Sequence, residues 1–154
     1  SDSLRSGGKI MFCGNGGSAS DAQHLSAELV GRYRKNRKPI ASVALTTDTS
    51  IITAVSNDFS FDDIFSRQVE SIGNDGDVLY AISTSGKSQN VINAIKAAKK
   101  LNIKTLGITG SDDSSFKKIC DLVISVPASR PDRIQEMHIA VGQIICEILE
   151  EELC

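Results

Sequence analysis

The chain has 154 residues, 40% of them hydrophobic and 23% charged, and its formal net charge is −2. This composition is typical of one globular domain with its own core, and it offers no basic surface for nucleic acid. No apolar run approaches the roughly 20 residues that span a membrane, so we expect no membrane partner.

The four cysteines, Cys13, Cys120, Cys146 and Cys154, lack the Cys-x-x-Cys spacing of redox and metal motifs. We interpret them as reduced, mostly buried thiols of a cytoplasmic protein without a signal peptide. The chain has no initiator methionine and opens directly before its first predicted strand. We therefore expect that residues are missing upstream.

Five short apolar segments are predicted to be strands, at residues 9–13, 41–45, 77–82, 104–109 and 122–126. The helices between and after them are expected at about 20–33, 48–56, 62–72, 89–101, 116–119 and 133–151, with Asn57 and Asp58 as helix breakers. This alternation predicts a single α/β domain over residues 1–154. It is a three-layer αβα sandwich whose five-stranded parallel sheet has the flavodoxin-like order 2-1-3-4-5.

Two polar loops follow the first and third predicted strands. Residues 14–18 are rich in glycine, and residues 83–88, the serine loop, carry four hydroxyl side chains and one glycine. In the predicted strand order these two strands end where the winding reverses, so both loops should line one crevice. Hydroxyls beside a helix N-terminus favour a bound anion. We interpret the serine loop as a phosphate cradle; taken alone, it also fits an ordinary loop with Ser88 as a helix cap.

Two segments resemble nucleotide-binding motifs, but neither fits its motif in full. The segment Gly86-Lys87-Ser88 resembles the end of an ATPase P-loop, but Ala81 stands where that motif needs its first glycine. Residues 14–19 fit the G-x-G-x-x-A dinucleotide fingerprint, yet the nearest acidic residue, Asp48, lies too far along the chain and past the second strand. We therefore expect neither ATP nor NAD as a ligand.

Two helices carry further candidate residues. His24 and Glu28 are four residues apart on the helix after the glycine-rich loop, so they share a face. They form either a solvated surface pair or a metal-binding or catalytic pair at the crevice. The final helix is too apolar for one covered face, so we expect it to pack against a partner subunit, with His138 partly buried in that interface.

Seven motifs in order carry a family resemblance: Cys-Gly-Asn-Gly-Gly-Ser (13–18), Asp-Ala-Gln-His (21–24), Ala-Glu-Leu-Val-Gly-Arg-Tyr (27–33), Asn-Asp-Phe (57–59), Phe-Ser-Arg-Gln-Val-Glu (65–70), Ile-Ser-Thr-Ser-Gly-Lys-Ser (82–88) and Asp-Arg-Ile-Gln-Glu-Met-His (132–138). Together they closely resemble the phosphoheptose isomerase family of sugar isomerase (SIS) domain proteins over essentially the whole chain. Members of that family carry an N-terminal helix that this chain lacks.

The resemblance implies conversion of sedoheptulose 7-phosphate to D-glycero-D-manno-heptose 7-phosphate, the first step towards the heptose of lipopolysaccharide core or of other surface glycans. It also implies a homotetramer with sites at subunit interfaces and one zinc ion per subunit. In such an isomerase, a carboxylate moves a proton between C1 and C2 through an enediol.

The resemblance implies residue roles by position. The phosphate would be bound by Ser83, Thr84, Ser85 and Ser88. The sugar would be bound by Asn15, Gly16, Gly17, Ser18, Arg32, Asn57, Asp58, Asp132 and Gln135. The base would be Glu28, and the metal ligands would be His24, Glu28, Gln135 and Gln143.

One position departs from the family pattern. Gln143 stands where the family usually has a histidine that acts as acid/base and metal ligand. An amide exchanges no proton near neutral pH and binds zinc less well than imidazole, so either the metal site is weaker or another group moves the proton. A related non-catalytic SIS subclass binds the bacterial replication initiator protein, but it typically lacks the glutamate kept here as Glu28. Glu28 therefore favours the enzyme, and an isomerase for a different phosphosugar stays open.

Overall fold

The computed structural model describes the backbone of residues 1–154 and the side chains of all of them except Ser114. Its sheet has five strands in the order β2-β1-β3-β4-β5, and neighbouring strands pair in parallel. The strands are β1 Ile10–Cys13, β2 Ser42–Ala44, β3 Val78–Ser83, β4 Lys104–Thr109 and β5 Leu122–Ser125. The predicted strand order is confirmed.

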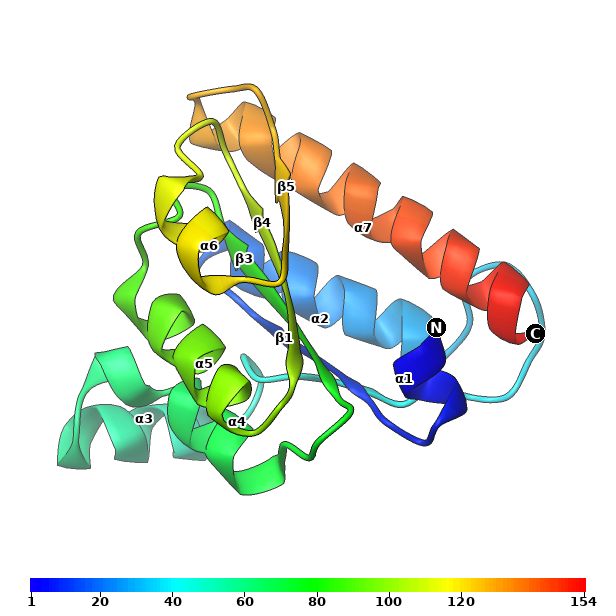
Figure 1. The fold of residues 1–154 in the computed structure, drawn as a ribbon, viewed down its shortest axis with the longest axis horizontal. Helices are drawn as coiled ribbons and strands as arrows, with labels where there is room; N and C mark the ends of the chain where they lie inside the picture. Colours follow the sequence, from blue (N-terminus) through cyan, green and yellow to red (C-terminus); the bar gives the residue numbers. More distant parts are fainter.

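Side chains alternate along each strand between two cores. In β1, Ile10 and Phe12 face one core, whereas Met11 and Cys13 face the other. Helices α2 (Gly17–Val30) and α7 (Pro131–Leu153) cover the first core and lie side by side in Figure 1. The opposite face carries α3 Thr49–Asp58, α4 Ser66–Ile72, α5 Gln89–Lys100 and α6 Ser114–Ile119. This is the predicted αβα sandwich.

The start of α2 differs from the prediction. The helix opens at Gly17, three residues before its predicted start at about residue 20. Gly16 adopts the left-handed conformation (φ +57°), and its carbonyl oxygen accepts hydrogen bonds from the N–H groups of Ala19 (3.0 Å) and Ser20 (3.2 Å). Because glycine reaches this conformation without steric cost, the loop turns directly into the helix.

Other boundaries differ as well. Helix α2 ends at Val30, because Gly31 leaves the helical conformation (φ −79°, ψ −102°). Helix α3 runs through Asn57 and Asp58, so the prediction that they break the helix is wrong; they form its last turn, where such residues cost little. Pro131 starts α7 because the first helical position needs no N–H donor.

Two further segments were not predicted. A short helix α1 (Asp2–Arg5) precedes β1, so the chain does not open directly on its first strand. The helix expected at 62–72 is divided into a 3₁₀ turn, η1 (Phe61–Asp63), and α4. The hydroxyl of Ser60 accepts a hydrogen bond from the N–H of Asp62 (3.1 Å) and fixes the start of η1.

Helices α2 and α7 pack very closely and run in the same direction. A Cβ atom on Gly142 of α7 would lie 2.5 Å from Cδ1 of Leu25, so the Leu25 side chain of α2 packs directly against the backbone of α7 at this glycine. His138 is buried on the sheet-facing side of α7, four residues before Gly142, with 1% of its surface exposed. The prediction of a partly buried interface histidine is therefore wrong, and burial lowers the pKa of His138.

The four cysteines are free thiols, with Cys13 and Cys146 buried, Cys120 partly buried and Cys154 exposed. Within the described part of the chain, no helix combines the length and the apolar character needed to cross a membrane.

Candidate active site

The serine loop is folded around its own hydroxyl groups. Gly86 has φ +64°, and its N–H donates to the Ser83 carbonyl oxygen at 3.2 Å. The Ser83 and Ser88 hydroxyl oxygens lie 3.0 Å apart, and the N–H of Lys87 donates to the Ser85 hydroxyl at 3.2 Å. Ser88 occupies the N-cap position of α5, but its side chain makes no capping hydrogen bond. The Ser83 and Ser88 hydroxyls are thus directed to each other rather than to the end of the helix, and the Ser85 hydroxyl accepts from the backbone of its own loop.

The charge of this loop is locally neutralised. The Lys87 ammonium lies 2.8 Å from the Asp112 carboxylate beyond β4, and both side chains are exposed. The N–H of Gly110 donates to the carbonyl oxygen of Thr84 at 3.1 Å, which holds the loop against the end of β4. The loop therefore offers neutral hydroxyl donors and the N-terminus of α5 to a ligand.

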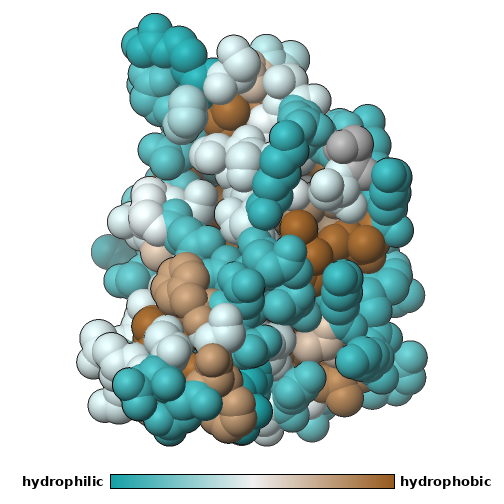
Figure 2. Space-filling view, turned by 90° about the vertical axis from the view of Figure 1, so that its left-hand side faces the viewer, coloured by the Kyte–Doolittle hydropathy of each residue, from teal (hydrophilic) through white to brown (hydrophobic). Residues whose placement is uncertain are grey.

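The glycine-rich loop and the serine loop are joined, as the strand order predicts. A Cβ atom on Gly14 would lie 3.0 Å from the carbonyl oxygen of Ile82 near the end of β3, so the glycine-rich loop lies against the strand that leads into the serine loop. Asn15 and Asn90, the latter at the start of α5, exchange two amide hydrogen bonds of 2.8 and 2.9 Å. Figure 2 faces this edge of the molecule and shows mostly hydrophilic and neutral residues around smaller apolar patches.

Asn90 joins the candidate site, although the sequence analysis did not predict it as a site residue. It is 2% exposed, and it stands next to Val91 in a row of buried residues that continues along α5. A polar residue within an apolar helical row is a usable signal, because a buried amide needs hydrogen-bond partners. Here its partner is Asn15, which was predicted to bind the sugar and which also connects the two loops.

The first turn of α7 reaches the glycine-rich loop. A Cβ atom on Gly17 would lie 2.7 Å from Nε2 and 2.9 Å from Oε1 of Gln135, so the absence of a side chain at Gly17 leaves room for this carboxamide. Gly16 is exposed beside it, whereas Ser18 is 3% exposed and packs against Gly14. Four residues predicted to bind the sugar, Gly16, Gly17, Ser18 and Gln135, therefore lie together at the start of α2.

His24 and Glu28 form a pair further along α2. The His24 Nε2 and Glu28 Oε1 atoms are 3.1 Å apart, and the side chains are 49% and 22% exposed. The pKa of Cys146 on α7 is raised to about 12, first by burial and then by the charge of Glu28. Gln143, which is partly buried, precedes Cys146 by one helical turn.

Four predicted residues lie on the surface, and the structure gives them no hydrogen bond to either loop in the part of the chain that it describes. Arg32 is exposed beyond α2. Asn57 donates to the Asp58 carboxylate at 2.8 Å at the end of α3. The Arg130 guanidinium donates two hydrogen bonds, of 2.7 and 3.2 Å, to the Asp132 carboxylate, and these bonds lower the pKa of Asp132.

The described side chains contain no cluster of three or more His, Cys, Asp or Glu residues that could hold a metal ion. A metal site of the predicted composition would therefore rest on His24, Glu28 and the neutral carboxamides Gln135 and Gln143.

The chain matches a known protein domain family. A sequence model of the SIS domain matches residues 1–110. The chain therefore belongs to the SIS domain family, whose fold is the parallel αβα sandwich described above.

Relatives with higher similarity narrow this class. A phosphoheptose isomerase of Rhodospirillum rubrum is 57% identical over 152 residues, which cover 99% of this chain and 81% of the relative. One from Campylobacter jejuni is 55% identical over 148 residues, covering 96% and 80%. The structure of the phosphoheptose isomerase from Neisseria gonorrhoeae superposes with a TM-score of 0.91 at 44% identity, covering 97% of this chain and 80% of that one. Within the SIS domain family, the chain thus falls among the phosphoheptose isomerases.

Proposed function

We propose that the chain is an aldose–ketose isomerase that converts sedoheptulose 7-phosphate to D-glycero-D-manno-heptose 7-phosphate. The observation that carries this proposal is that α2 begins at a loop hydrogen-bonded to the helix that follows the serine loop, and carries the Glu28 carboxylate, paired with His24, in its last turn. One element thus links a phosphate-binding crevice to a carboxylate. The names of the relatives support the substrate class.

The reaction would proceed through an enediol. The phosphate binds to the serine loop hydroxyls, and Glu28 takes a proton from C1 of the ketose and returns it to C2, while the hydroxyl proton passes from O1 to O2. The carboxamide of Gln135 and the loop residues orient the polyol chain. The product enters the synthesis of heptose for lipopolysaccharide core or another surface glycan in the cytoplasm.

A zinc ion fits part of this site. His24 and Glu28 supply two strong donors that already lie 3.1 Å apart, and Gln135 and Gln143 would supply weaker carboxamide oxygens. When bound, the cation would polarise the substrate carbonyl. Because two of the four donors are neutral amides, we propose that zinc binds weakly.

We further propose a homotetramer whose sites lie at subunit interfaces. The outer side of α7 exposes Met137, Ile144 and Ile148 by 48%, 55% and 46%, and Val30 of α2 is 49% exposed. Such a row of exposed apolar residues is typical of a surface that a second chain covers. In that assembly Arg32, Asn57, Asp58 and Asp132, which lie on the surface of one subunit, would reach the site of a neighbour.

The test is turnover of sedoheptulose 7-phosphate by the wild-type protein with zinc added. Glu28→Gln should lower kcat by about 10²- to 10⁴-fold, the usual contribution of a general base, at an unchanged Tm. Ser85→Ala should mainly raise KM. A wild-type protein without turnover would defeat the proposal, and full activity of Glu28→Gln would show that another group is the base.

Gln143 motivates one alternative, a non-catalytic SIS module that binds a phosphosugar or the replication initiator protein. Binding of the phosphosugar without turnover, together with capture of purified replication initiator protein, would favour this alternative.

A further inference from the structure

A buried carboxylate near the end of α7 holds the segment that follows α2. The Glu150 carboxylate accepts hydrogen bonds from the backbone N–H groups of Tyr33 (3.1 Å), Arg34 (2.8 Å) and Lys35 (2.8 Å), and from Nε of Arg37 (2.8 Å). The Glu150 and Arg37 side chains are each 3% exposed. Burial alone would raise the pKa of Glu150, but these four donors lower it to about 2.

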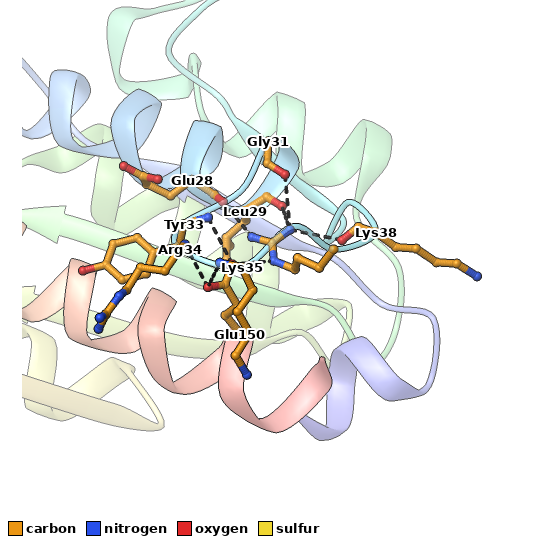
Figure 3. A network of polar contacts seen from close by, with 9 residues as sticks. Glu28, Leu29, Gly31, Tyr33, Arg34, Lys35, Lys38 and Glu150 are labelled. Atoms are coloured by element: carbon orange, nitrogen blue, oxygen red, sulfur yellow. Dashed lines mark hydrogen bonds and ion pairs between the residues drawn. The ribbon is translucent and has the colours of Figure 1, made fainter.

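Figure 3 shows Glu150 beside the backbone of Tyr33, Arg34 and Lys35, close to the end of α2. Arg37 connects this carboxylate to the end of α2. Its Nη2 donates to the carbonyl oxygen of Glu28 at 2.8 Å, and its Nη1 donates to that of Leu29 at 2.8 Å. The last carbonyl groups of a helix have no partner within the helix. The guanidinium of Arg37 therefore satisfies these groups and places a positive charge at the negative end of the helix dipole.

Stability alone does not require this arrangement. Two charges are costly to bury, and apolar residues of similar volume often stabilise a fold as well or better. What an apolar pair cannot do is fix the direction of backbone carbonyl groups. The planar guanidinium, with donors at fixed angles, does so for the turn that carries Glu28.

We propose that Arg37 and Glu150 are positioning residues for the reaction: together they fix the last turn of α2 and thereby aim the Glu28 carboxylate. This inference rests on the proposed function, in which Glu28 is the base. Arg37 itself acts through the Glu28 backbone and remains outside the catalytic machinery.

The first variant is Arg37→Lys, which keeps the charge but loses the planar set of donors. Its kcat should fall about 10- to 100-fold with KM changed less than about threefold, because a misplacement near 1 Å can cost on the order of 10²-fold in rate. The matched control is Arg34→Lys, since the exposed Arg34 guanidinium pairs with Glu147 and makes no hydrogen bond to α2 among the described residues. This control should keep the wild-type kcat.

A second measurement separates positioning from general loss of structure. If Arg37 acts through Glu28, Arg37→Lys should have no further effect on the residual rate of Glu28→Gln, because the effects of residues that act as one unit are not additive. Amide hydrogen exchange should also become faster in the last turn of α2, while exchange in β3 and β4 stays as in the wild type.

The outcomes are distinct. An unchanged kcat in Arg37→Lys, or additive losses in the double variant, would overturn the inference while the proposed isomerase stands. Lack of wild-type turnover would overturn the proposed function; local acceleration of exchange in Arg37→Lys would then still support the fixing of the α2 end, and unchanged exchange would overturn it. Should Arg37→Lys fail to fold, Glu150→Gln is measured in the same way, with the same expected results.

Discussion

Replacement of Gly17 by alanine should impair the candidate active site without weakening the fold. The new Cβ atom would lie 2.7 to 2.9 Å from the amide atoms of Gln135, and ordinary contact begins near 3.4 Å. The carboxamide must therefore retreat by about 0.5 to 0.7 Å. It is the far end of a flexible side chain, so it can move without disturbing the backbone of α7.

The effect of this change on the free energy of unfolding should be small. Alanine gains about 0.5–1 kcal/mol over glycine in a helix, and an off-rotamer Gln135 costs about 0.5–1.5 kcal/mol. The two terms nearly cancel, so stability should change by less than about 1 kcal/mol. In contrast, kcat/KM should fall roughly tenfold if Gln135 binds substrate, since a 1 Å displacement can cost on the order of 10²-fold.

The assay is a double-mutant cycle of Gly17→Ala and Gln135→Ala. Steady-state kinetics with sedoheptulose 7-phosphate give kcat/KM for each variant, and thermal unfolding gives Tm. If the alanine acts by displacing Gln135, it should have no effect in the Gln135→Ala background. Ser20→Ala, on the exposed surface of the first turns of α2, is the control and should behave as wild type.

Two results would refute this reasoning. Full activity of Gly17→Ala would mean that the position of Gln135 is irrelevant to the reaction. Equal losses from Gly17→Ala with and without Gln135 would mean that glycine is needed at position 17 for another reason, such as close approach of the ligand itself.

Further predictions concern stability. Gly142→Ala should cost about 1–3 kcal/mol, because its Cβ would overlap the buried Leu25 side chain and overpacking of this kind forces helices apart; Leu25→Val in the same chain should restore part of the loss in denaturant unfolding. Acid should also destabilise the protein. Asp121, hydrogen-bonded by a lysine, and Glu150 both have a pKa near 2, below their ordinary values of 3.8 and 4.5. The contribution of these two carboxylates to the free energy of unfolding is fully present when the pH is above their ordinary pKa values. It is lost as the pH falls towards 2. Tm should therefore decline over that range, and less so in Asp121→Asn; an identical decline in both proteins would contradict the assignment.

The sheet could be predicted because its signals are local. Each strand is a short apolar run between polar turns, and the parallel order follows from the helices between strands. Helix ends were less predictable. Helix α2 was predicted from about residue 20, but the left-handed Gly16 starts it earlier, at Gly17. A glycine can lie within a turn or at the N-cap of a helix, and the sequence does not distinguish these two positions.

In the candidate site, too, only the features with a local signal in the sequence could be predicted. The hydroxyls of the serine loop were visible because they are contiguous in the sequence. The positioning role of Arg37 was not, because residues 35–39 look like a basic connection that ends in proline. Arg37 is buried because the carboxylate of Glu150, 113 residues further along the chain, pairs with it in the fold. Long-range pairs of this kind depend on how α7 lies against α2, which no local pattern encodes.

The last prediction concerns Gln143, where the family resemblance places a histidine. If this residue is a metal ligand, Gln143→His should tighten zinc binding by at least the roughly tenfold that changes around metal ligands produce. An imidazole is the stronger zinc ligand and also titrates near neutral pH, so kcat should rise as well. Gln143→Asn keeps the amide and is the matched control.

Zinc affinity can be measured by competition with a chromophoric chelator, which needs no turnover. A tighter complex for Gln143→His alone would place residue 143 at the metal. Equal affinities in wild type, Gln143→His and Gln143→Asn would remove Gln143 from the ligand set. The metal would then depend on His24, Glu28 and Gln135, and proton transfer on Glu28 without a partner from this position.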